Sequence, residues 1–241
     1  MELEHAGAYQ LNAGSDRLLF MERLRTLKEL YQSQINLIAE FASSFAEERL
    51  QGPLLMDPTT YYHQPTKLLI VGQETAGWSS KYENVEEQLI TYRKFNLGEK
   101  ANSPFWNITR RIEEQLGIQP LSCAWTNLNR YDQAGKPPAG MVLQALPSLD
   151  FLVLEEIQIL CPDVCLFYTN RKNDHRLTAL YPGLQFSDIE GLPSSLFARL
   201  THAELPSLTL RTPHPKWMQL KRWSATFLAT FQRLSNNASN D

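Results

Sequence analysis

Residues 67–77, KLLIVGQETAG, decide the fold of this chain. The segment contains a continuous run of apolar residues, which is typical of a strand buried on both faces of a parallel sheet. Gly72 follows the run, and we expect it to let the backbone turn sharply there. Polar residues come directly after the turn. The stretch therefore predicts a buried strand whose carboxyl end carries polar side chains.

Three later stretches resemble this one, and helical patterns separate them. The strand-like stretches are SCAWTN (122–127), PDVCLFYTN (162–170) and SLTLRT (207–212). Apolar residues at three- and four-residue steps predict helices over 16–50, 84–95, 104–116, 141–160, 194–200 and 217–234. Strands that alternate with helices predict an α/β fold, a three-layer α/β/α arrangement around a central, mainly parallel four-stranded sheet. We expect residues 1–65 to form an N-terminal helical extension packed on a catalytic domain of residues 66–241.

Composition excludes several classes of protein. The 241 residues are 43% hydrophobic and 20% charged, so a disordered or fibrous chain is excluded. The net charge of −3 argues against coating nucleic acid by bulk electrostatics, although a local basic groove remains compatible with it. The apolar runs are too short to cross a membrane, and the polar start predicts no secretory signal. The three cysteines fit no complete zinc or iron–sulfur pattern, so we expect reduced thiols in a cytoplasmic protein. We also expect a monomer.

Polar residues that can carry chemistry follow the predicted strands. In open α/β sheets the ligand binds beyond the carboxyl ends of the strands. Glu74 follows the first strand, Asn127 ends the second and His214 follows the last. Arg171 and Lys172 follow the third strand. A carboxylate, an amide, an imidazole and cations are therefore expected at one edge of the sheet.

Each of these residues also has an ordinary structural interpretation. Glu74 could cap a helix or lie in a solvated turn, and His214 could be a loop histidine between two prolines. Asn127 could close a turn through its own backbone. The cations, taken singly, could simply be solvated. A functional site is favoured because all of these residues are predicted to lie at the ends of strands.

The order of these motifs resembles the uracil-DNA glycosylase superfamily. That superfamily has a Gly-Gln-Asp-Pro-Tyr motif after its first strand, an Asn after its second and a His-Pro-Ser-Pro-Leu motif after its last. The corresponding segments here are GQETAG (72–77), AWTN (124–127) and HPKWM (214–218). SPFWNI (103–108) is similar to the Pro-rich loop that contacts phosphate in the family. The resemblance covers residues 66–235.

The resemblance implies a monofunctional DNA glycosylase, which flips a pyrimidine nucleotide out of the duplex and hydrolyses its N-glycosidic bond to leave an abasic site. Glu74 matches the family's Asp position, where a carboxylate stabilises the sugar cation and orients water. His214 matches the donor to the departing base. Asn127 matches the residue that reads the base edge. This reaction needs no metal or other cofactor.

The resemblance also implies binding residues. Those expected to contact the base are Gln73, Thr75, Ala76, Trp78, Phe105 and Asn127. The ring that stacks on the base remains open among Trp78, Phe95 and Phe105. Those expected to contact DNA are Ser103, Pro104, Arg130, Thr212, Pro213, Lys216, Trp217 and Met218, with Trp217 or Met218 as the apolar wedge.

Two departures from the family bear on the base. Glu74 is one methylene longer than Asp, which shifts the carboxylate or its loop. Thr75-Ala76 replaces the Pro-Tyr whose ring excludes a C5 methyl group, so discrimination at C5 should relax. This favours a cytosine enlarged at C5 by a hydroxymethyl or glucosyl group, as occurs in phage DNA, and hence a possible defence role. The alternative is a uracil-DNA glycosylase of base excision repair, with Trp78 refilling the space.

The sequence also leaves other functional classes as alternatives. A catalytically silent DNA-binding module on the same fold would not need both Glu74 and His214. An unrelated α/β hydrolase or nucleotide-binding protein is disfavoured, because the sequence has neither a Gly-x-Ser-x-Gly elbow nor a phosphate-binding Gly-rich loop. Free nucleosides or RNA are further possible substrates.

Overall fold

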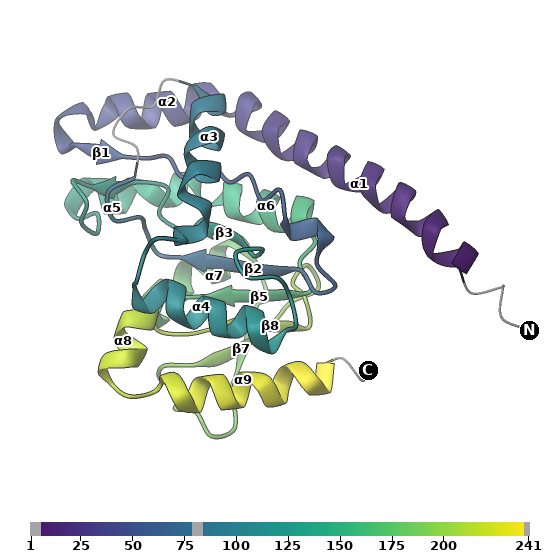
Figure 1. Ribbon diagram of the computed structural model, residues 1–241. Helices are drawn as coiled ribbons and strands as arrows, with labels where there is room; N and C mark the ends of the chain where they lie inside the picture. The colour runs from purple at the N-terminus through teal and green to yellow at the C-terminus, as the bar shows by residue number, and fades with distance from the viewer. Residues whose placement is uncertain (1–5, 79–83, 239–241) are drawn as a thin grey trace, which may run out of the picture.

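A computed structural model describes residues 6–78 and 84–238 (Figure 1). The α-helices are α1 (Ala6–Ser33), α2 (Ile35–Ser44), α3 (Val85–Phe95), α4 (Pro104–Gln115), α5 (Gly140–Ala145), α6 (Phe151–Leu160), α7 (Asp174–Leu180), α8 (Pro215–Leu220) and α9 (Ser224–Ala238). The strands are β1 (Leu50–Gln51), β2 (Leu68–Gly72), β3 (Ala124–Asn127), β4 (Asp132–Gln133), β5 (Val164–Phe167), β6 (Gln185–Ser187), β7 (Ala198–Thr201) and β8 (Leu208–Arg211). Short 3-10 helices lie at Ala46–Glu48, Tyr61–His63, Asn96–Gly98, Leu146–Leu149 and Arg171–Asn173.

The central sheet has the strand order β3-β2-β5-β8-β7-β6. Its first four strands pair in parallel, and they are the four strands that the sequence predicts. All residues of β2, β3, β5 and β8 are buried, which explains why each appears in the sequence as an unbroken run. The parallel core of the prediction is therefore confirmed.

The prediction of four strands is wrong in number, because β7 and β6 extend the sheet to six. β7 pairs antiparallel with both β8 and β6. It occupies part of the segment 194–200, for which a helix was expected. Ala198 and Leu200 are buried while Arg199 and Thr201 are more exposed, so the pattern has the two-residue period of a half-buried strand.

Helices flank the sheet in two groups (Figure 1). In one group α4 contacts α8 and α9, and in the other α1 contacts α3 and α6. The chain is therefore an α/β protein, and the arrangement is compatible with three layers. In the part of the chain that the structure describes, no helix is both long enough and apolar enough to cross a membrane.

Three long predicted helices are divided in the structure. The helix expected over 141–160 consists of α5 and α6, with the 3-10 helix Leu146–Leu149 between them. The helix expected over 16–50 consists of α1 and α2, which meet at Gln34. The helix expected over 217–234 is divided into α8 and α9, with Arg222 in the left-handed conformation between them (φ +60°). The short helix α8 therefore lies by itself between β8 and α9.

The first 65 residues pack onto the sheet domain in several places. Leu27 and Tyr31 of α1 and Ile38 of α2 belong to the same hydrophobic core as the central strands. β1 pairs antiparallel with β4, which lies shortly after β3. These contacts bring the N-terminal segment close to the carboxyl end of β3.

Candidate active site

The carboxyl ends of β2 and β3 bring two predicted site residues next to each other. Gly72, the last residue of β2, is the register partner of Asn127, the last residue of β3. A Cβ built on Gly72 would lie 2.2 Å from Asn127 Oδ1 and 3.4 Å from Cε2 of Phe105. Because only a glycine leaves that space free, the amide of Asn127 and the ring of Phe105 can meet over the strand end.

The Phe105 ring connects this point to the last strand. Phe105 is in the first turn of α4 and is partly exposed. Its ring centroid lies 5.9 Å from that of His214 and 5.3 Å from that of Tyr168. Of the three rings considered for stacking on a base, Phe105 is therefore the one that lies between Asn127 and His214.

Asn127 is completely buried and only half of its amide is engaged. Its Oδ1 accepts a hydrogen bond from the indole N–H of Trp125 (3.2 Å). Its Nδ2 is buried and has no hydrogen-bond partner among the described residues. A buried donor without a partner is costly, and such groups in native proteins call for an explanation, a ligand among them.

Glu74 lies just beyond β2 and is held by a buried chain of polar groups. Asn129 Nδ2 donates to Glu74 Oε2 (3.1 Å), and Asn129 Oδ1 accepts from Arg176 Nη1 (2.6 Å). Arg176 in turn forms an ion pair with Asp150, with Nε donating to Oδ2 (2.8 Å). Because Arg176 engages the oxygen of the Asn129 amide, the NH2 group of that amide must face Glu74.

Burial raises the pKa of the Glu74 carboxyl, while the hydrogen bond from Asn129 and the charge of Lys172 oppose that rise. The ionised carboxylate is thus supported by specific groups in a partly desolvated place. Perturbed carboxyl groups of this kind cluster at functional sites.

The loop after Glu74 is anchored by Asp132, a residue that the sequence did not single out. Asp132 Oδ2 accepts from Thr75 Oγ1 (2.6 Å), from the backbone N–H of Gly77 (2.9 Å) and from that of Trp78 (3.3 Å). Asp132 is completely buried. Thr75 is therefore committed to shaping the loop, and Ala76 remains exposed at its tip.

His214 immediately precedes α8 and caps it. Its Nδ1 accepts from the backbone N–H of Lys216 (3.2 Å), and its own backbone N–H donates to Oδ1 of Asn170 (3.0 Å). Burial and the charge of Lys216 both lower the pKa of the imidazole. A neutral ring whose Nδ1 accepts must carry its proton on Nε2, so this nitrogen is a donor.

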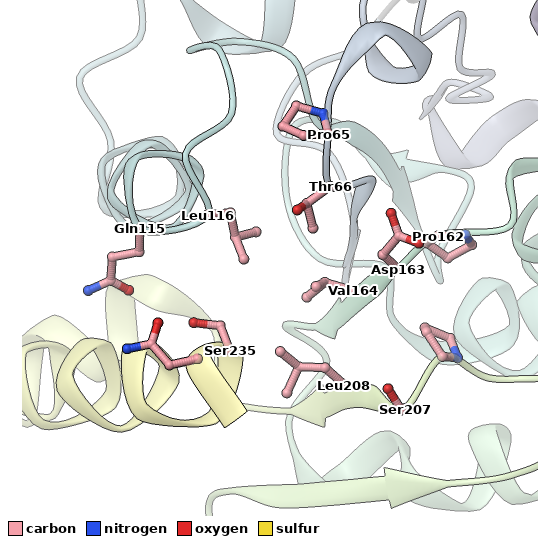
Figure 2. A pocket seen from close by; sticks show the side chains of 12 residues that line it. Pro65, Thr66, Gln115, Leu116, Pro162, Asp163, Val164, Ser207, Leu208 and Ser235 are labelled. Carbon is pink, nitrogen blue, oxygen red and sulfur yellow. The ribbon is translucent and has the colours of Figure 1, made fainter. Parts of the chain in front are cut away.

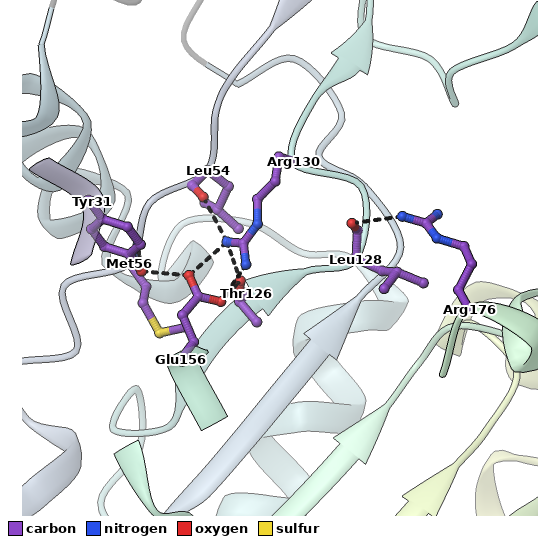
Figure 3. A network of polar contacts seen from close by, with 8 residues as sticks. All are labelled: Tyr31, Leu54, Met56, Thr126, Leu128, Arg130, Glu156 and Arg176. Carbon is purple, nitrogen blue, oxygen red and sulfur yellow. Dashed lines mark hydrogen bonds and ion pairs between the residues drawn. The ribbon is translucent and has the colours of Figure 1, made fainter. Parts of the chain in front are cut away.

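Arg130 was predicted to contact DNA, and the structure contradicts this. Its side chain is completely buried and paired with Glu156, with Nη1 donating to Oε1 (2.7 Å) and Nη2 donating to Oε2 (2.5 Å) (Figure 3). Arg130 also donates to Thr126 Oγ1 (2.8 Å), and the hydroxyl of Tyr31 donates to Glu156 Oε1 (2.6 Å). The guanidinium is a structural group in the core.

Three residues near the last strand are also corrected. Met218 is completely buried, so it cannot act as the wedge. Thr212 is completely buried with its hydroxyl on the carbonyl of Pro213 (2.9 Å), and Pro213 is buried as well, so neither side chain is available to phosphate. On α8 the apolar side chain that reaches solvent is Leu220, which is 70% exposed, while Trp217 is partly buried and lies beside Lys221.

Two predicted base-binding residues point elsewhere. Trp78 is buried in an aromatic cluster against Phe95 and Trp125, and its indole N–H donates to Gln88 Oε1 (3.0 Å). Gln73 is buried, and its side-chain amide donates to the carbonyl of Tyr168 (3.3 Å). Trp78 therefore belongs to the core and does not refill the space beside Ala76.

Several predicted DNA contacts do lie on the accessible side. Ser103 caps α4 by accepting from the backbone N–H of Trp106, and Pro104 begins that helix, with both residues partly exposed. Lys216 is exposed beside His214, whose pKa it lowers. Lys172, which was expected only as a cation at a strand end, is exposed, and its charge lowers the pKa of Glu74. These groups offer hydroxyl, backbone and ammonium contacts to a phosphate chain.

A cavity of about 510 Å³ lies at the opposite edge of the sheet (Figure 2). Its lining includes Thr66, Asp163 and Ser207, which precede β2, β5 and β8, together with residues of α4 and α9. Ligands of open α/β sheets bind at the carboxyl ends of the strands, which is the other edge. The cavity is therefore separate from the site.

Comparisons with known proteins do not identify the chain. No family model matches its sequence, and no curated protein matches it. The chemistry of the residues at the strand ends therefore carries the functional interpretation.

Proposed function

We propose that this chain is a DNA glycosylase with a fold like that of uracil-DNA glycosylases, which flips out a pyrimidine nucleotide and hydrolyses its N-glycosidic bond. One observation carries the proposal. A partly buried carboxylate and an N–H-donating imidazole follow β2 and β8, and β3 ends in a buried amide whose NH2 group has no partner among the described residues. The aromatic ring of Phe105 lies between the amide and the imidazole.

Glu74 supplies the negative charge that the reaction needs. The sugar develops oxocarbenium character as the base leaves, and a carboxylate beside it stabilises the cation and orients the attacking water. Asn129 supports this role, because its amide, which Arg176 orients, donates to Oε2 of Glu74, and the other carboxylate oxygen would orient the water. The C1′–N1 bond breaks with its electron pair on the departing pyrimidine, which then takes a proton from solvent. Water adds to C1′ and gives its proton to Glu74, which leaves an abasic site.

His214 is placed to stabilise the departing base. Its lowered pKa keeps the imidazole neutral at physiological pH, and the backbone of Lys216 occupies Nδ1. The Nε2–H can then donate to the pyrimidine O2, on which negative charge accumulates. A preorganised donor of this kind typically contributes about 3–4 kcal/mol to transition-state stabilisation.

Asn127 and Phe105 would bind the base itself. The Nδ2 of Asn127, which has no partner in the described part of the chain, would gain an acceptor from the Watson–Crick edge, and Phe105 offers its ring for stacking. Burying the base beside these groups would offset the cost of unstacking it from the duplex.

The proposed substrate is a cytosine enlarged at C5 by a hydroxymethyl or glucosyl group. Ala76 is exposed, and Trp78 is held in the core, so neither forms the bulky wall that would reject a C5 substituent. Such bases occur in phage DNA, and their removal would serve defence against phage. Uracil is the competing substrate, and the assay below separates the two.

Contacts with the DNA would come from the surface around this edge. Ser103, Pro104, Lys172 and Lys216 are available for phosphates, and Leu220 or Trp217 on α8 is available as an apolar wedge. Positive charge gathered here would explain binding to DNA despite a net charge of −3.

Base release from defined oligonucleotides tests the proposal. Single- and double-stranded substrates would carry uracil, cytosine, 5-hydroxymethylcytosine or its glucosylated form, and alkaline cleavage would reveal abasic sites. Glu74→Gln and His214→Ala should abolish most of the release, whereas Arg233→Ala, whose side chain pairs with Glu190, is the matched control. Release of uracil alone would replace the proposed substrate, and intact DNA binding with no release would indicate a silent binding module.

A further inference from the structure

Trp125 makes a contact that the proposed reaction does not require. Its indole N–H donates to Oδ1 of Asn127, two residues further along β3. Trp125 and Asn127 are both buried. An indole N–H can only donate, so the atom that faces it must be the amide oxygen. The orientation of the Asn127 amide is thereby fixed by its neighbour.

The indole is itself held firmly. Its rings pack against those of Trp106 (5.1 Å between centroids), Phe95 (5.6 Å) and Trp78 (5.6 Å). The hydroxyl of Tyr92 accepts a hydrogen bond from the backbone N–H of Trp125 (3.0 Å). Rotation of the indole away from Asn127 would disturb this whole cluster. The indole N–H therefore stays in a fixed position from which it donates to the Asn127 amide.

The two classes of pyrimidine present opposite patterns to such an amide. A 4-oxo pyrimidine offers an acceptor at position 4 and a donor at N3, whereas a 4-amino pyrimidine offers a donor at position 4 and an acceptor at N3. An amide that is free to turn by 180° can match both classes in one pose. An amide whose oxygen accepts from a fixed N–H can match only one class of pyrimidine. If that amide turned by 180°, its NH2 group would face the fixed N–H, and two donors would oppose each other.

We propose that Trp125 is a positioning residue that locks the Asn127 amide, so that the site accepts either 4-oxo or 4-amino pyrimidines but not both. This inference rests on the proposed function, since it assumes that a flipped pyrimidine reaches Asn127. It extends that function by assigning the discrimination at position 4 to an indole that never touches the base.

The test compares Trp125→Phe with the wild type. Phenylalanine keeps an aromatic ring in the cluster and removes the N–H. Trp78→Phe is the matched control, because it makes the same change in the same cluster but removes a bond to Gln88. Duplexes carrying hydrolysis-resistant 2′-fluoro-2′-deoxyuridine and 2′-fluoro-2′-deoxycytidine report discrimination by binding alone, and base release reports it by catalysis.

The wild type should favour one analogue by about 10- to 100-fold, the range expected when a buried hydrogen-bonding group is left unpaired. In Trp125→Phe that ratio should fall to within about threefold, whereas Trp78→Phe should retain it. An unchanged ratio in Trp125→Phe, or no discrimination in the wild type, would overturn the inference. Discrimination in binding without any base release would refute the proposed function and leave the inference standing.

A second measurement does not depend on the stability of the tryptophan variants. The Trp125 indole proton should exchange slowly with solvent in the wild type and faster in Asn127→Ala, which removes its acceptor. The Trp78 indole proton, whose acceptor is Gln88, should exchange equally in both proteins. Equal exchange of the Trp125 proton in the two proteins would show that the lock does not exist.

Discussion

Gly72→Ala should damage the site through a single contact. Gly72 ends β2, and its φ lies outside the left-handed region, so the backbone itself tolerates alanine. The new Cβ, however, would lie 2.2 Å from Oδ1 of Asn127, so the amide must move away by about 1 Å to reach ordinary contact.

The cost of that movement can be estimated from the surroundings. Asn127 is completely buried and bonded to Trp125, so it cannot retreat without disturbing the core. Overpacking of this kind typically destabilises a protein by about 1–3 kcal/mol. A displacement of about 1 Å in a base-binding group is expected to reduce base release by roughly 100-fold.

A double-mutant cycle isolates the contact. Urea unfolding would be measured for the wild type, Gly72→Ala, Asn127→Ala and the double variant, with base release measured in parallel. In the Asn127→Ala background the clash is gone, and Gly72→Ala should be neutral or stabilise by about 0.4–1 kcal/mol through its effect on the unfolded chain. If Gly72→Ala is equally destabilising in both backgrounds, the cause is not the contact with Asn127, and the account of this strand end is wrong.

Three further predictions concern the core, the carboxylate and the wedge. Arg130→Met should destabilise the fold by about 3–5 kcal/mol, because it strands the buried charge of Glu156, and the salt dependence of DNA binding should not change; urea unfolding and binding titrations at several salt concentrations check both. Asn129→Ala removes a hydrogen bond that lowers the pKa of Glu74, so that pKa should rise further and the acid limb of the pH–rate profile should move to higher pH; a limb that stays in place would exclude Asn129 as a support. Leu220→Ala should weaken release from duplex DNA by roughly tenfold and leave release from single strands unchanged, as steady-state assays on both would show.

The parallel core was predictable because it depends on local composition. β2, β3, β5 and β8 are short apolar runs that end in polar turns, and burial on both faces produces that pattern. β6 was missed because all three of its residues are exposed at the sheet edge. The break before α9 was missed because it depends on Arg222, a residue type that gives no sign of a left-handed conformation.

The positions of three site candidates at strand ends were predictable from the sequence, because Glu74 and His214 come shortly after β2 and β8 and Asn127 ends β3. Their supporting groups were not predictable, since Arg176 on α7 reaches Asn129 across 47 positions in the sequence. The role of Arg130 was misjudged for a similar reason. A charged residue in a polar stretch suggests solvent, but its partner Glu156 lies in the middle of α6.

The buried hydrogen-bond network around Glu156 affects how this chain can be cut or recombined with others. Tyr31 donates to the Glu156 carboxylate and accepts from the backbone N–H of Met56 (3.3 Å), and the carbonyl of Leu54 accepts from Arg130 (3.2 Å). Residues before position 66 therefore supply hydrogen-bond partners to the Arg130–Glu156 ion pair, although both members of that pair come later in the chain. A fragment cut at residue 66, or a chimera that joins this sheet to a foreign N-terminal segment, would inherit the charges without their partners. A recombinant protein should therefore take both parts, residues before 66 and the sheet domain, from the same parent.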